Sequence, residues 1–313
     1  MDALLESETS IAILLGTYHG ASFLSEQLAS FEWQTHHNWR LYVSDDGSDT
    51  ATDIILKQFQ AKHAQHQVHL RKGPSQGFAK NFLFLACDPH IDADYYAFSD
   101  QDDIWEPNKI SAAIKWLKTV SEEVPAIYCS RTCLINSQGE AMGCSVKLKK
   151  KPGFAHALVQ NIANGNTMVF NHAAKKLLLL AGGIVDVTSH DWWLYIVVTA
   201  CGGQIEFDPQ PSVRYRQHDN NLIGYKTGLL NKSKSIYRLL KGQFKSYNEK
   251  HVKALVKLYP YMTPENQDIF SKFIDIRKVS LLKRLHILHS SGIYRQTLVG
   301  NMGLVFAAMI NRL

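Results

Sequence analysis

The chain has 313 residues, of which 45% are hydrophobic and 20% charged, and these values exclude a disordered chain and indicate a folded protein with a sizeable core. No run reaches the roughly 18 apolar residues of a membrane-spanning helix. The net charge of +6 is unevenly distributed, because residues 226–313 contain 16 Lys and Arg against 4 Asp and Glu. We therefore expect two regions, an acidic body and a basic tail.

Apolar strands alternate with amphipathic helices along the first hundred residues, which predicts a parallel α/β sheet whose strand-end loops share one edge. The expected strands are Ile11–Leu15, Arg40–Ser44, Val68–Leu70, Tyr95–Ser99, Ala126–Ile135, Asn164–Phe170, Gln204–Phe207 and Ser212–Gln217. The expected helices are Ala21–Trp33, one capped by Ser48 or Asp49, Phe78–Cys87, Asn108–Val120 and His190–Cys201. Residues 145–153 are predicted to form an irregular basic loop, and the chain after residue 226 is predicted to form helices without a strand.

The compartment is indicated by the first residues and by the cysteines. Acidic residues at positions 2, 6 and 8 replace the basic start of a secretory signal. The five cysteines are an odd number without a tight pairing pattern, so we expect them to be reduced. These features predict a cytoplasmic protein.

Two acidic clusters follow expected strand ends. Asp100 and Asp102 offer the hard oxygen ligands that Mg²⁺ and Mn²⁺ prefer, and Asp45 and Asp46 can accept hydrogen bonds from a nucleoside. Ligands bind at this edge of open α/β sheets, and carboxylates gathered there are costly unless a positive group lies between them. Each cluster alone is also consistent with a solvated helix-capping turn.

Three further segments carry chemistry-bearing residues. The loop Gly73–Gly77, with Lys80 nearby, is either a contact for a diphosphate or a plain turn. Asp191 opens an apolar helix, as a general base or as a helix cap. Arg216 and His218 end the last expected strand, where they can bind phosphate and metal.

The order of these motifs resembles the signature series of family 2 glycosyltransferases of the GT-A fold, over about residues 11–224. Two segments, Ser99–Trp105 and Arg216-Gln-His-x-Asn-Asn, further resemble the rhamnosyltransferase-like group of bacterial surface-polysaccharide assembly. The motifs that carry the resemblance are Thr17-Tyr18, Asp45-Asp46-Gly47-Ser48, Gly77-x-x-x-Asn81, Ser99-Asp-Gln-Asp-Asp-Ile-Trp105, Gly165-Asn-Thr-Met168, His190-Asp191-Trp-Trp and the Arg216 segment.

The resemblance implies an inverting transferase that uses Mn²⁺ or Mg²⁺. Its donor would be a nucleoside-diphosphate sugar such as dTDP-rhamnose, and its acceptor a saccharide or lipid-linked saccharide. Asp191 would be the catalytic base, and Asp102, with Asp100 and His218, would hold the metal. The implied nucleotide-sugar-binding residues are Thr17, Tyr18, Asp45, Asp46, Gly77, Lys80, Asp100 and Arg216.

The implied architecture is a Rossmann-like, mostly parallel GT-A domain over residues 1–225, with a donor half at about 11–105 and an acceptor half at about 106–225. A basic helical extension over residues 226–313 would dock the enzyme peripherally on the inner face of the cytoplasmic membrane. The alternatives are another metal-dependent nucleotide-sugar enzyme, such as a nucleotidyltransferase, and a nucleic-acid-binding protein that uses the basic tail. We expect no nucleic-acid partner.

Overall fold

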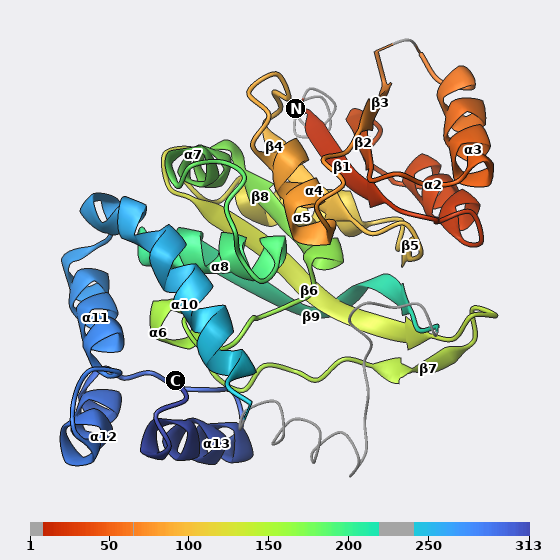
Figure 1. The fold of residues 1–313 in the computed structure, drawn as a ribbon. Helices are drawn as coiled ribbons and strands as arrows, with labels where there is room; N and C mark the ends of the chain where they lie inside the picture. Colours follow the sequence, from red (N-terminus) through yellow and green to blue (C-terminus); the bar gives the residue numbers. More distant parts are fainter. Residues whose placement is uncertain (1–8, 65, 219–240) are drawn as a thin grey trace.

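One nine-stranded sheet with helices on its faces forms the body of the protein, seen in a computed structural model that describes residues 9–64, 66–218 and 241–313 (Figure 1). The strand order is β3-β2-β1-β4-β8-β6-β9-β5, with β7 paired to β6. The strands are β1 (Ile11–Thr17), β2 (Trp39–Asp45), β3 (Val68–Lys72), β4 (Tyr95–Ser99), β5 (Ile104–Trp105), β6 (Ala126–Ile135), β7 (Ala141–Cys144), β8 (Val169–Asn171) and β9 (Gln204–Arg216).

The helices cover both faces of the sheet and continue into a helical C-terminal region. In the body they are α2 (Leu24–Glu32), α3 (Thr50–Ala61), α4 (Phe78–Ala86), α5 (Lys109–Leu117), α6 (Phe154–Ala157), the 3₁₀ turn η1 (Gly165–Thr167), α7 (His172–Leu180) and α8 (His190–Ala200). In the C-terminal region they are α10 (Gln243–Leu255), η2 (Val256–Tyr261), α11 (Pro264–Asp275), α12 (Leu281–Ser290) and α13 (Leu298–Met309).

The first four strands form the expected parallel sheet. Strand β1 lies between β2 and β4 and pairs in parallel with both, while β3 pairs in parallel with β2. Thr17 lies opposite Asp45, and Leu15 lies opposite Ser99, so the three strands end at the same edge. The prediction that the loops after these strands share one edge is therefore confirmed.

In the second half of the sheet, β5 and β7 were not expected, and three of the expected strands take a different form. Gln204–Phe207 and Ser212–Gln217 were expected as two strands, but β9 is continuous and changes register opposite Ser130 and Arg131. Its prolines at 209 and 211 lack a backbone N–H, which accounts for the local break in pairing. The expected strand Asn164–Phe170 begins instead as a 3₁₀ turn and becomes the short antiparallel strand β8.

Helix α8 lies at the centre of the second half, and all eleven of its residues are buried. A helix that is apolar on all sides requires partners on all sides. The C-terminal helices supply part of that contact, because Phe270 and Phe273 of α11 and Leu288 of α12 belong to the same apolar cluster as Trp193. The side chain of Asn266 also donates hydrogen bonds to the carbonyls of Thr199 and Ala200 and so caps the C-terminus of α8.

The expected helical tail is confirmed over the described residues 241–313, which contain no strand. The spacing of basic and apolar residues over 232–245 predicts a basic amphipathic helix; residues 232–240 lie outside the described residues, and Phe244 and Lys245 belong to α10. Within the described part of the chain, no helix combines the length and the apolar character needed to cross a membrane.

Because α11 and α8 share one core, we predict that the body and the C-terminal helices unfold together. Phe273→Ala removes a side chain that is 1% exposed and should lower the free energy of unfolding by about 3–5 kcal/mol. Val256→Ala, at a site that is 53% exposed, is the control and should change it little. Urea denaturation followed both by tryptophan fluorescence, which reports on the body, and by far-ultraviolet circular dichroism, which also reports on the tail helices, should show coincident transitions; an earlier loss of helix signal would contradict this.

Candidate active site

The ends of β1 and β2 form one side of the site. The hydroxyl of Thr17 donates a hydrogen bond of 2.7 Å to Asp45 Oδ1, and the backbone N–H of Ser48 donates one of 2.9 Å to Asp45 Oδ2. Thr17 is 1% exposed, whereas Tyr18 is 59% exposed. These bonds hold the carboxylate of Asp45 in place, and the open ring of Tyr18 provides an apolar surface on which a base can stack.

Asp46 has a different task in this structure, because it organises the loop Gly73–Gly77. Its carboxylate accepts hydrogen bonds from the backbone N–H groups of Ser75, at 2.6 Å, and Gly77, at 3.2 Å. Gly77 has φ of +88°, a conformation that favours glycine, and leads directly into α4. Lys80, one turn into α4, donates to the side chain of Gln76 in the same loop.

Gln101 joins the first loop to the acidic loop that follows β4. Its side-chain oxygen accepts from the backbone N–H of Tyr18 at 2.8 Å, and its amide donates to the carbonyl of Tyr18 at 2.9 Å. Gly20 packs so closely against Gln101 that an added Cβ would lie 2.2 Å from the amide oxygen. Gln101 had no predicted role, although its place between Asp100 and Asp102 is a usable signal.

The carboxylates of Asp100 and Asp102 lie in the loop between β4 and β5, and His218 reaches this loop from the end of β9. His218 Nε2 lies 2.7 Å from Asp102 Oδ2. Burial, followed by the nearby charges of Asp102 and Asp191, raises the pKa of Asp100 to about 8. Two consecutive residues of η1 join Asp191, from the second half of the chain, to the acidic loop: the N–H of Gly165 donates to Asp191 Oδ2, and Asn166 Nδ2 donates to Asp103 Oδ2.

The expected three-ligand metal set is only partly assembled. Across residues 9–64, 66–218 and 241–313, no three His, Cys, Asp or Glu side chains converge as a metal site. Asp102 and His218 are in contact, while Asp100 completes no such group. An oxygen and a nitrogen donor beside a crowded carboxylate fit a divalent cation that takes its remaining ligands from phosphates and water.

Arg216 occupies a position that differs from the expected diphosphate contact. Its side chain is 1% exposed, and its guanidinium donates to the carbonyls of Asp102 and Ser137 and to the carboxylate of Glu26. Its backbone N–H also donates to Asp103, whose carboxylate is completely buried. The expectation that Arg216 binds phosphate directly is therefore corrected, because its buried side chain and its backbone N–H hold the acidic loop in place.

Asp191 stands in the first turn of α8, where its Oδ1 accepts a hydrogen bond of 2.7 Å from the N–H of Trp192. The N-cap is Ser189, and Asp191 Oδ2 accepts hydrogen bonds from Asn161 Nδ2, at 3.0 Å, and from the N–H of Gly165, at 3.1 Å. The neighbouring His190 stacks on Phe82 with ring centroids 3.9 Å apart. Burial lowers the pKa of His190 to about 4, so this imidazole is neutral near pH 7.

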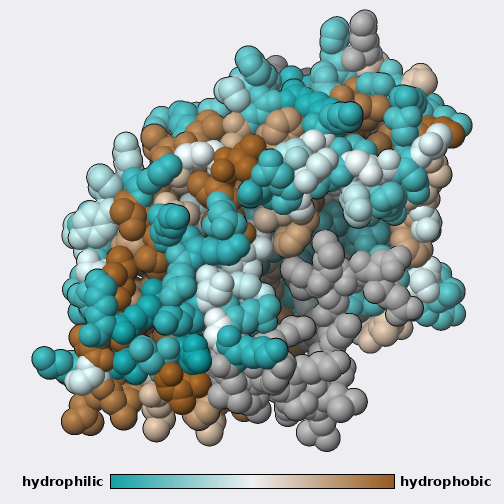
Figure 2. Space-filling view, in the orientation of Figure 1, coloured by the Kyte–Doolittle hydropathy of each residue, from teal (hydrophilic) through white to brown (hydrophobic). Residues whose placement is uncertain are grey.

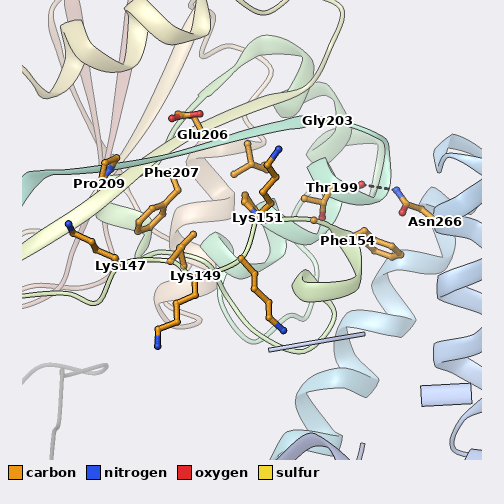
Figure 3. A pocket seen from close by; sticks show the side chains of 15 residues that line it. Lys147, Lys149, Lys151, Phe154, Thr199, Gly203, Glu206, Phe207, Pro209 and Asn266 are labelled. Atoms are coloured by element: carbon orange, nitrogen blue, oxygen red, sulfur yellow. Dashed lines mark hydrogen bonds between the residues drawn. The ribbon is translucent and has the colours of Figure 1, made fainter. Parts of the chain in front are cut away.

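A separate groove of about 760 Å³ lies along the first part of β9 (Figure 3). The irregular loop predicted over residues 145–153 forms one wall, and none of the site residues expected from the sequence lines the groove. In Figure 3 the side chain of Lys149 points away from β9. The lining residues are Lys147–Phe154, Thr199, Gly203, Ile205–Phe207, Pro209 and Asn266.

One cysteine pair was not anticipated. Cys133 of β6 and Cys144 of β7 are cross-strand neighbours with their sulfur atoms 3.2 Å apart, and all five cysteines are free. Their separation of eleven residues gave no pairing signal, because strand β7 itself was not expected.

The mixed α/β sheet with acidic loops at its strand ends has the GT-A fold. Residues 12–133 match the family described as Glycosyl transferase family 2. This match and the relatives named as glycosyltransferases support a glycosyltransferase over the nucleotidyltransferase alternative.

The relatives agree with this assignment. The dTDP-rhamnosyl transferase RfbG of Shigella flexneri is 29% identical over 67% of this chain and 73% of its own length. An uncharacterized glycosyltransferase of Nostoc sp. is 28% identical over 35% of this chain and 33% of its own length.

Solved structures share the fold at low sequence identity. TarS of S. aureus in complex with UDP-GlcNAc has a TM-score of 0.55 at 11% identity, covering 97% of this chain and 90% of that one. A mannosyltransferase of Pyrobaculum calidifontis in complex with GDP-Man and Mn²⁺ has a TM-score of 0.51 at 15% identity, covering 96% and 85%.

Two neighbouring arginines allow a matched test of the acidic-loop contacts. Arg216→Ala leaves buried acceptors without donors and should lower the free energy of unfolding by about 2–4 kcal/mol. Arg214→Ala breaks a pair with Glu106 at the surface and should cost less than about 1 kcal/mol. Equal losses in urea denaturation of the two variants would show that Arg216 does not hold the loop.

Proposed function

We propose that the chain catalyses inverting transfer of a sugar from a nucleoside diphosphate to an acceptor hydroxyl. One observation carries the proposal: two consecutive residues of η1 link the candidate base to the acidic loop, because the N–H of Gly165 donates to Asp191 and the side chain of Asn166 donates to Asp103. A candidate base and a candidate leaving-group site are thus adjacent. The relative named as a dTDP-rhamnosyl transferase supports dTDP-rhamnose as the donor, and the UDP-GlcNAc and GDP-Man complexes of the structural neighbours support a nucleotide sugar in general.

The nucleotide would bind at the ends of β1 and β2. Thr17, Tyr18 and Asp45 hold the base and ribose, with the carboxylate of Asp45 accepting from hydroxyl or base N–H groups. Asp46 acts indirectly by shaping the loop that ends at Gly77. That loop and Lys80 lie beside the same strand end and face the diphosphate.

A divalent cation, Mn²⁺ or Mg²⁺, would be held by Asp102 and His218, with Asp100 contacting either the cation or the ribose. When bound, it supplies counter-charge to the departing diphosphate. Arg216 contributes by holding the carbonyl of Asp102 and the side chain of Asp103, and so positions the loop that carries the ligands.

The reaction is a single displacement. Asp191 accepts the proton of the acceptor hydroxyl as that oxygen forms a bond to the anomeric carbon. The bond from this carbon to the diphosphate breaks at the same time, with inversion, and the nucleoside diphosphate leaves. The N–H of Gly165 and the amide of Asn161 keep the carboxylate oriented, so the chain acts chiefly by aligning the reactants.

The cellular role would be the assembly of a bacterial surface polysaccharide, with a saccharide or lipid-linked saccharide as acceptor. Such acceptors lie at the inner face of the cytoplasmic membrane. The excess of basic residues after position 225 supports peripheral association with that surface.

A thermal-shift screen of nucleotide sugars with and without Mn²⁺ tests the donor assignment. We expect dTDP-rhamnose to raise the melting temperature in a Mn²⁺-dependent manner and to support transfer. Asp102→Ala should abolish both the metal-dependent shift and turnover, because the diphosphate loses its counter-charge. Full turnover by this variant with metal present would rule out the metal assignment.

The base assignment predicts a separation of chemistry from binding. Asp191→Asn should lower the transfer rate by about 10²–10⁴-fold while donor affinity stays within a few-fold. Asp186→Asn is the control, because Asp186 precedes α8 and pairs with Lys250 at the surface. Equal losses of donor affinity and rate in Asp191→Asn would indicate a structural role instead.

A further inference from the structure

Helix α13 exposes a continuous apolar face. We name it the α13 face, and its side chains have exposed fractions between 43% and 78%. The opposite side of the helix, with Leu304, Ala307 and Ala308, is buried against the rest of the protein. Packing within the chain therefore buries only one side of α13. The residues of the α13 face are Leu298, Val299, Met302, Val305, Phe306 and Met309.

The spacing of these residues shows that they belong to one surface. They recur at intervals of three and four positions, which places them on one side of a helix. The start of α12 adds Leu281 and Leu282, which are 44% and 81% exposed. In Figure 2 apolar brown surface gathers along the lower edge of the molecule, in the region of α12 and α13 in Figure 1.

The charged side chains that follow α11 in the sequence are all basic. Asp275 is the last acidic residue of the sequence, and residues 276–313 contain six Lys and Arg. Of these, Lys278, Lys283 and Arg312 are exposed.

A second basic segment, the lysine loop Lys147–Lys151, is fixed beside the start of α13. Gln296, two residues before α13, accepts hydrogen bonds from the backbone N–H groups of Lys149, at 3.1 Å, and Lys150, at 2.9 Å. The hydroxyl of Tyr294 donates to the carbonyl of Lys151. All four lysines of the loop are exposed.

We propose that the α13 face inserts into the interface of an anionic bilayer while the lysine loop contacts lipid headgroups. The proposal rests on the peripheral association proposed above and assigns it to residues outside the 232–240 segment. Apolar side chains bordered by basic ones match the apolar boundary and the negative surface of such a membrane. A second copy of the chain is a poorer partner, because it would bring the same positive charges together.

Co-sedimentation of the full chain with phosphatidylcholine vesicles, with and without phosphatidylglycerol, tests the surface. Leu298→Gln/Met302→Gln/Phe306→Gln replaces three apolar side chains by a polar residue that favours helices, and it should weaken partitioning onto anionic vesicles by about tenfold or more. The matched control Ile54→Gln/Leu180→Gln/Ile184→Gln changes three exposed apolar residues elsewhere and should bind like the wild type.

Charge-reversal variants test the lysine loop. Lys149→Glu/Lys150→Glu should weaken binding to anionic vesicles and reduce its salt dependence, whereas Lys62→Glu/Lys118→Glu, at exposed sites on the body, should change both less. Transfer to a water-soluble acceptor, measured in parallel, should be unchanged in all four variants, because none of these residues belongs to the proposed site.

The outcomes distinguish the proposals. Wild-type binding by the triple α13 variant would overturn the assignment of the surface. A wild-type protein that transfers sugar but does not pellet with anionic vesicles would overturn membrane association and leave the transferase proposal intact. A wild-type dimer in the absence of lipid that becomes monomeric in the triple variant would assign the α13 face to a second copy.

Discussion

The site depends on how a buried arginine fixes the loop whose carboxylates gather at one edge of the sheet. Asp100, Asp102 and Asp103 follow a single strand, and burial raises the pKa values of Asp100 and Asp103 above those of free aspartate. Arg216 lies at the end of β9 and donates hydrogen bonds to this loop from its backbone N–H and its guanidinium. The long strand β9 thus has a chemical consequence, because it carries Arg216 and His218 back to a loop formed more than 100 residues earlier.

The second constraint is the burial of α8. A helix that carries Asp191 at its start must be held firmly if the carboxylate is to stay in line with an acceptor. Asn266 from α11 fixes its far end, and the aromatic residues of α11 enclose it. The C-terminal helices are therefore structural partners of the proposed catalytic helix. This sharing of one core also makes point variants more informative than truncations for testing the tail.

The sequence predicted the elements whose burial follows a simple pattern. The apolar runs Tyr95–Ser99 and Ala126–Ile135 match β4 and β6 in full. Strand β7 was missed because all of its residues are exposed, so no hydrophobic pattern marks it. The candidate site was located by motif order, but the task of Arg216 could not be inferred. Its partner Glu26 lies 190 residues away, and only the folded chain brings the two together.

The packing at Gly165 restricts how this enzyme can be altered. A Cβ added there would lie 2.6 Å from Nε2 of His190 and 3.2 Å from Cβ of Asp191. Even alanine would press on the stacked imidazole and move the neighbouring carboxylate. Combinatorial libraries that randomise this loop to broaden the range of acceptors should therefore keep glycine at position 165 and vary the surrounding side chains. Most substitutions at 165 would misalign the carboxylate of Asp191, and any gain in selectivity would then go undetected.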